Sequence, residues 1–136
     1  MPIHFRIDHG LKLVVAAGHG ELVHSDVLDY QRDVWSRPEV AGYNELVDMT
    51  HVTHIHLESP QHIKDLATLA AEMDLPGGAS KFAIVAPSHL SFGLGRMFQS
   101  HRELDPRSTK EVAVFKTLHE ALEYLGVTGP VELPGP

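Results

Sequence analysis

The sequence predicts an α/β fold, a single-domain sandwich built on a five-stranded mixed sheet with about four helices. Strand-like and helix-like hydrophobic patterns alternate along most of the 136 residues, and two strand-like segments follow each other directly at the start. No linker-like segment divides this stretch, and the chain is long enough to bury a substantial core. Alternating strands and helices favour a parallel sheet, and the opening pair adds an antiparallel edge strand.

The first three segments predict a hairpin and a helix. Residues 3–8 alternate apolar and polar side chains, which is typical of a half-buried strand. Residues 11–18 are almost continuously apolar, which predicts a strand inside the sheet. An amphipathic helix follows over 25–35, with Ser25 as its predicted N-cap, and it ends before Pro38.

The middle of the chain repeats the strand–helix alternation. Residues 43–49 predict a short third strand, and 59–73 predict a second helix. Ser59 is the expected N-cap of this helix, and Pro60 suits its first position because that N–H needs no partner. Residues 81–87 are apolar throughout and predict a strand buried on both faces.

The last elements are a helix over 88–101, a strand over 111–115 and a helix over 117–126. Thr117 and Glu120 form a capping box, and Gly126 suits the helix end. We assign residues 1–126 to the domain. Residues 127–136 are rich in proline and glycine, and we expect them to form a loose tail.

Composition narrows the class of protein. The formal net charge of −7 disfavours nucleic acid as a partner, and the chain has no cysteine to form a disulfide or a thiolate metal site. We find no signal peptide and no apolar run long enough for an integral membrane segment. We therefore expect a cytoplasmic protein, and nothing in the sequence indicates a cofactor.

Residues 50–62 contain four histidines. His54 and His56 have the i, i+2 spacing that would place both rings on one face of an extended segment, and His51 lies nearby. A metal site needs a further well-placed ligand, and none has suitable spacing. We expect these to be partly exposed loop histidines and predict no bound metal. Metal binding at His54 and His56 and a role in proton transfer remain the alternatives.

A second candidate site follows the fourth predicted strand. Ser88 and Ser91 begin the third helix, where unpaired backbone N–H groups can bind an anion, and Arg96 could add a positive charge. Gly93 and Gly95 each cost the helix about 1 kcal/mol relative to alanine, which indicates close packing against another helix, a partner or a ligand. We expect binding at Ser88, Ser91, Gly93 and Arg96, with helix packing as the alternative.

The sequence around these glycines matches no Walker loop and no dinucleotide fingerprint, and no serine hydrolase elbow occurs. The mixed charges at 102–110 are expected to form a solvated helix end and loop.

Several segments resemble one protein family. GELVHSDVLDY at 20–30 and ELVDMTHVTHIHLES at 45–59 resemble the STAS fold of anti-sigma-factor antagonists. AIVAPSHLSFGLGRMFQ and VFKTLHEALEYLG are similar to the SpoIIAA-like (STAS/SEC14-type) group of small bacterial proteins, and together the resemblance covers about residues 3–126. The resemblance implies a five-stranded α/β sandwich with no established catalysis.

The chain departs from the STAS pattern where regulatory members carry a phosphorylated serine in a DSSG segment. The matching positions here are His56, Leu57, Glu58 and Ser59, so the usual phosphoacceptor is absent. Glu58 could act there as a fixed negative charge in a ligand- or partner-binding site.

We therefore expect a non-enzymatic regulatory or binding module. It would bind a partner protein or a small apolar or anionic, lipid-like ligand, and it could form a homodimer. The alternative is a histidine-dependent metal-binding or hydrolytic enzyme.

Overall fold

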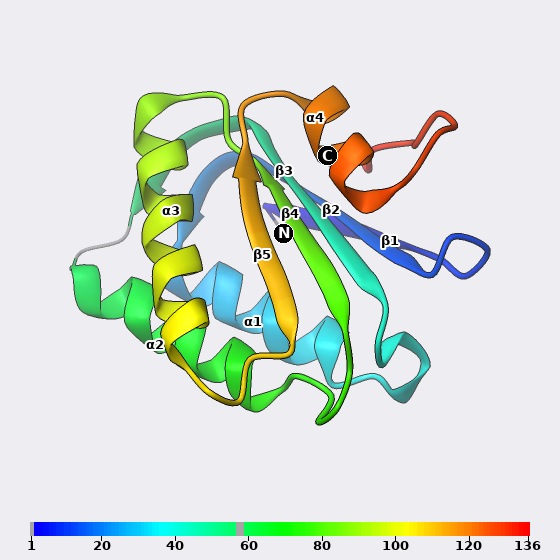
Figure 1. Ribbon diagram of the computed structural model, residues 1–136. Coiled ribbons are helices and arrows are strands. Elements are labelled where there is room, and N and C mark those ends of the chain that lie inside the picture. Colours follow the sequence, from blue (N-terminus) through cyan, green and yellow to red (C-terminus); the bar gives the residue numbers. More distant parts are fainter. Residues whose placement is uncertain (1, 57–58) are drawn as a thin grey trace.

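The computed structural model describes residues 2–56 and 59–136, and its strands form one sheet whose spatial order follows the chain (Figure 1). β1 runs antiparallel to β2, and the other neighbouring strands are parallel. The predicted mixed sheet, with the second and fourth strands inside it, is confirmed. The strands are β1 (Ile3–Asp8), β2 (Leu13–Val23), β3 (Asn44–His56), β4 (Ser80–Val85) and β5 (Lys110–Phe115).

The helices cover the two faces of this sheet unequally. Strand–helix–strand crossovers are nearly always right-handed, so successive crossovers that step in one direction place their helices on one face. Accordingly α1, α2 and α3 lie on one face, and α4 lies on the other with the C-terminal residues (Figure 1). The helices are α1 (His24–Trp35), the 3₁₀ turn η1 (Pro38–Val40), α2 (Pro60–Glu72), α3 (His89–Leu104) and α4 (Leu118–Leu125).

Each interior strand contributes to both layers because successive side chains point to opposite faces. In β2, Val14 and Ala16 pack with α1, whereas Leu13 and Val15 pack with α4. The pattern repeats in β4, where Phe82 and Ile84 face α2 and α3. Both faces are therefore buried, which explains the continuous apolar runs of these two strands.

The C-terminal residues are packed, so the expected loose tail is wrong. Val127, Val131 and Leu133 lie against the same apolar cluster that α4 covers. The Arg6 guanidinium of β1 donates a 2.8 Å hydrogen bond to the backbone carbonyl of Glu132. A few apolar side chains within a proline- and glycine-rich stretch are enough to fix it against an open sheet face.

The predicted cap at Ser25 is wrong, whereas Ser59 occupies the predicted N-cap position of α2 and Pro60 the first helical position. The first helix already includes His24, and Ser25 lies inside its first turn. Ser59 precedes α2, but its hydroxyl makes no capping hydrogen bond. The caps at α4 are confirmed: the Thr117 hydroxyl accepts the backbone N–H of Glu120, and Gly126 ends the helix with a φ of 75°.

The third strand is longer than predicted. β2 and β3 remain paired beyond residue 18, with His19 opposite His51 and Val23 opposite His56. Irregularities after Ala17 and Gly20 keep the two strands together there. In this stretch polar histidines flank Ile55, which obscured the strand-like pattern in the sequence.

Candidate ligand-binding site

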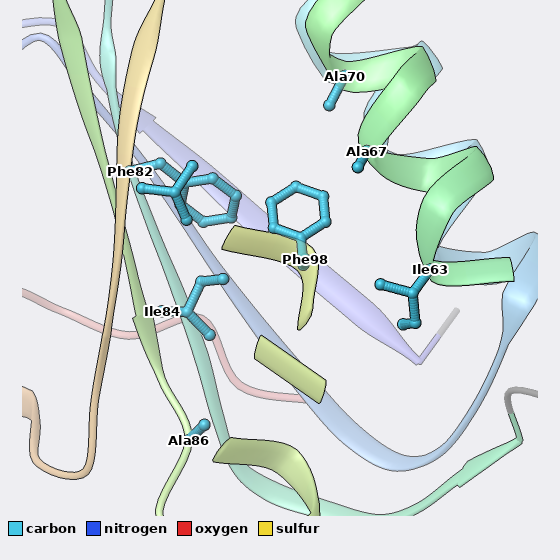
Figure 2. Close-up of a cluster of buried hydrophobic side chains, with 8 residues drawn as sticks. Ile63, Ala67, Ala70, Phe82, Ile84, Ala86 and Phe98 are labelled. Atoms are coloured by element: carbon cyan, nitrogen blue, oxygen red, sulfur yellow. The ribbon is translucent and has the colours of Figure 1, made fainter. Parts of the chain in front are cut away.

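An apolar cavity of about 120 Å³ lies between the sheet and the three helices on its larger covered face. Figure 2 shows the neighbouring core, in which the Phe98 ring lies between α2 and Phe82 of β4. The cavity is bordered by side chains from β3, β4, α1, α2 and α3. Its lining includes Val47, Phe82, Ile84, Ile63, Leu66, Leu94 and Phe98.

Gln31 of α1 gives this cavity a polar margin. Its side chain is buried, and the contact found for its amide nitrogen is a long one, 3.9 Å from the Met73 sulfur. Gln31 also lines a second hollow of about 180 Å³, whose other walls include Trp35, Asp74 and Lys110. Gln31 therefore has an apolar cavity on one side and a more polar hollow on the other.

A buried charged cluster borders both spaces. Glu45 accepts hydrogen bonds from the Tyr30 hydroxyl at 2.8 Å and the Trp35 indole N–H at 3.1 Å, and its other oxygen accepts one from the Lys110 ammonium at 3.1 Å. The Lys110 nitrogen also lies 2.9 Å from the centre of the Trp35 ring. These groups satisfy one another, so the cluster stabilises the fold around the cavity.

Burial shifts the pKa values of two members of this cluster, Lys110 and Tyr30. Loss of solvent lowers the pKa of Lys110, and the Glu45 carboxylate opposes that change. Burial and the same carboxylate raise the pKa of Tyr30 well above its usual value. The Tyr30 hydroxyl therefore stays protonated and donates to Glu45 across the physiological pH range.

A second buried ion pair corrects the interpretation of residues 102–110 as a solvated charge run. Arg102 of α3 is buried and pairs with Asp74, which follows α2. The same Asp74 oxygen accepts the backbone N–H groups of Thr109 and Lys110. Sequence reasoning missed this network because Asp74 lies 28 residues from Arg102 and 35 or 36 residues from the two backbone donors. Glu103 and Arg107 of this run are exposed as expected, and Arg107 pairs with Asp105.

The structure divides the predicted site residues of α3 into two groups. The Ser88 hydroxyl lies 2.6 Å from the Ser91 hydroxyl and accepts the Ser91 backbone N–H, so it caps its own helix. Ser91 is buried and lines the apolar cavity. Gly93 and Arg96 lie on the exposed side of α3, so the four residues do not surround one ligand.

The two glycines of α3 also differ. A Cβ atom on Gly95 would lie 3.0 Å from a methyl group of Val114 in β5, so Gly95 allows the helix to approach the sheet closely. A Cβ atom on Gly93 would meet nothing within 4 Å. Close packing within the chain therefore explains Gly95 and leaves Gly93 unexplained.

Three histidines of the 50–62 segment, His51, His54 and His56, lie on β3 and not in a loop, which corrects that expectation, and His62 lies in α2. The rings of His54 and His56 are 4.4 Å apart on one face of β3, and His51 stacks on His19 of β2 at 5.5 Å. Within residues 2–56 and 59–136, no group of three or more histidine or acidic side chains is placed to hold a metal ion. Glu58, the other predicted site residue of this segment, lies outside the described residues.

One histidine pair was not anticipated from the sequence. His24 begins α1 and His62 lies in the first turn of α2, and their rings stack with centres 4.2 Å apart. Both Nδ1 atoms are buried and have no hydrogen-bond partner among the described residues. Burial, aided by the neighbouring His62, lowers the pKa of His24, and Asp65 opposes the change. The pair lies 38 residues apart in the chain, so no local motif marked it.

Comparison with known proteins supports the fold. No protein-family model matches the chain, and no curated protein matches it. Among solved structures, the chain is similar to an uncharacterized protein of the DUF3478 family with a SpoIIAA-like fold from Shewanella loihica PV-4. The two are 19% identical, the match covers 90% of this chain and 93% of that one, and the TM-score is 0.55. The predicted resemblance to SpoIIAA-like proteins is thus confirmed at the level of the fold. Over the part of the chain that is described, no helix has the length and apolarity needed to cross a membrane.

Proposed function

On the premise of a SpoIIAA-like fold, we propose that this protein is a non-enzymatic binding module that takes up a small apolar or amphiphilic molecule. The observation that carries the proposal is the apolar cavity between the sheet and α1, α2 and α3. Its walls are almost wholly hydrocarbon, and binding pockets for small molecules are typically concave, mostly apolar and edged by a few polar groups. The absence of cysteine supports our placing this activity in the cytoplasm.

The size of the cavity limits the ligand. Apolar cavities near 150 Å³ bind molecules as small as benzene, so a space of about 120 Å³ suits an alkyl group of about six carbons or one aromatic ring. A longer chain would extend out of the cavity. Gln31 at the margin offers an amide to a hydroxyl or carboxylate at the end of such a molecule.

Thermal unfolding in the presence of small amphiphiles tests this proposal. We expect octanol and octanoate to raise the melting temperature, because a ligand that binds only the folded state at about 100 times its Kd adds about 2.7 kcal/mol to stability. Inorganic phosphate, which has no apolar part, should have no effect. An effect of octanoate alone would show that the carboxylate is required.

Cavity-filling variants provide the control. Leu66→Phe and Val27→Phe place a larger side chain in the cavity wall and should abolish the ligand-induced shift. Leu122→Phe, on the α4 face, is the matched control and should retain it. If neither amphiphile shifts the melting temperature of the unmodified protein, or if both cavity variants keep the shift, the proposal is wrong.

A second candidate function is favoured by the exposed side of α3. Leu90, Met97 and Leu104 are exposed there to 62%, 36% and 81%, beside the predicted site residues Gly93 and Arg96. Exposed apolar side chains gathered on one helix face are typical of protein-binding surfaces. We propose that this face binds a protein partner, independently of the cavity.

A further inference from the structure

The outer stripe of α3 consists of Leu90, Gly93, Met97, Ser100 and Leu104. These positions are spaced by alternating three and four residues, the heptad pattern with which one helix packs along another. The opposite side of the helix carries its buried residues, including Gly95 and Phe98. The stripe therefore faces away from the domain.

The stripe alternates large and small side chains. Leu90, Met97 and Leu104 occupy one heptad position, and Gly93 and Ser100 occupy the other. In an antiparallel helix pair, each layer brings one kind of position on the first helix against the other kind on the second. A second copy of α3 would thus place Leu104 over Gly93 and Met97 over Ser100, large against small in each of these layers, while Leu90 would lie beyond the end of the paired helix. Gly93, which has no role inside the chain, would then allow close approach.

Charges on the flank of the stripe are also self-complementary. Arg96 and Glu103 are exposed, lie seven residues apart and share one flank. Antiparallel pairing brings this flank against the same flank of the other copy, so Arg96 of one copy meets Glu103 of the other, twice by symmetry. A parallel pair would lack this match, and the net charge of −7 disfavours an anionic membrane as occupant.

We propose that the partner of this face is a second copy of the chain, joined through an antiparallel α3–α3 pair whose two-fold axis passes between Met97 and Ser100. The inference rests on the proposed protein-binding function of α3 and not on the cavity. A helix of 16 residues is about 24 Å long, so this contact is small and the dimer should dissociate on dilution.

Sedimentation equilibrium with charge-reversed variants tests the contact. Met97→Glu should leave a folded monomer, because the side chain is exposed in the single chain. Arg96→Glu and Glu103→Arg should each weaken association roughly fivefold or more, since each reverses both symmetric pairs. The double variant Arg96→Glu, Glu103→Arg should restore it. Octanol binding should be unchanged in all of them, which separates this test from that of the cavity.

Single cysteines test the direction of pairing on a chain that has none of its own. With a short bis-maleimide cross-linker, Met97→Cys should give a covalent dimer because it lies next to the axis. Leu90→Cys should not, because its two copies would be roughly 25 Å apart along an antiparallel pair.

Several outcomes would overturn the proposal. A chain that is monomeric at all concentrations has no such dimer. Cross-linking at both positions means a parallel pair. Failure of the double variant to regain association means that the charges do not pair, and binding of α3 to phosphatidylglycerol vesicles with loss of the dimer means that the face is a membrane contact.

Discussion

At the scale of single residues, the structure buries charged side chains that the sequence analysis placed on the surface. Arg102 stands in a run of charged residues, yet it is 2% exposed and reaches across to Asp74. Charged side chains are almost never fully buried without a partner, so the pair must act as a unit. The Asp74 oxygen also holds two backbone N–H groups at the start of β5, which ties α2, α3 and β5 together.

Replacing Arg102 should therefore be among the most damaging changes in the chain. Arg102→Met keeps the apolar stem but leaves the buried Asp74 carboxylate without its cation, and we expect a loss of about 3–5 kcal/mol in unfolding free energy. Urea unfolding measures this loss. Arg107→Met, whose guanidinium pairs with Asp105 on the surface, is the matched control and should change stability little. Equal losses in the two variants would contradict the network.

The histidine pair makes stability depend on pH. The folded pKa of His24 lies below its ordinary value of 6.5, so the unfolded chain binds more protons below that pH. Stability is then fully present above about pH 6.5 and falls as the pH drops toward the folded pKa. Charging His24 also places a cation in the first turn of α1, where the helix dipole opposes positive charge. His62 lowers the pKa of His24 and Asp65 raises it, so the net direction is set by burial.

We expect His24→Gln to flatten the dependence of stability on pH below 6.5. Urea midpoints at several pH values between about 5 and 7.5 test this, and the slope follows from the linkage between proton binding and folding. His89→Gln is the control, because His89 begins α3 as His24 begins α1 but is exposed. A variant profile as steep as that of the original protein would show that His24 does not contribute.

At the scale of elements, periodicity predicted all five strands and the four α-helices, because burial on one or two faces determines which positions in an element are apolar. The second half of β3 was not predicted, because exposed histidines interrupt its apolar pattern. Ile55 lines the apolar cavity from this half, but it stands alone between His54 and His56. The cap at Ser25 failed because a suitable residue type does not fix where a helix begins. The apolar cavity could not be predicted, since it depends on how α1, α2 and α3 pack together.

The two glycines of α3 should respond oppositely to alanine. Gly95→Ala places a methyl group 3.0 Å from Val114 and should destabilise the protein despite its better helix propensity. Gly93→Ala meets nothing within the chain and should stabilise the helix by up to about 1 kcal/mol. Thermal unfolding at concentrations too low for association measures both changes. A stabilising Gly95→Ala would mean that α3 can move away from β5 without cost.

At the scale of the whole molecule, the C-terminal residues complete the thinly covered face of the sheet. Removing residues 129–136 would expose the surface under Val131 and Leu133 and delete the acceptor of Arg6. We expect a loss on the order of 2–4 kcal/mol from these two apolar side chains. Removing only Gly135 and Pro136, which are exposed, is the control and should have little effect. Calorimetry measures the melting temperatures. If both truncated proteins have the same melting temperature as the full chain, the packing of the C-terminal residues does not contribute to stability.

The order of strands along the sheet also bears on how the protein is made. Each strand lies beside the one synthesised just before it, so a chain leaving the ribosome can add strands one after another with a neighbour already in place. The exception is the α4 face, which is closed by α4 and the C-terminal residues, including a contact that joins positions 126 residues apart. Until those residues emerge, Leu13, Val15 and Leu46 on that face remain uncovered. A nascent chain arrested before α4 should therefore bind holdase chaperones, and release should follow the addition of the last twenty residues or so.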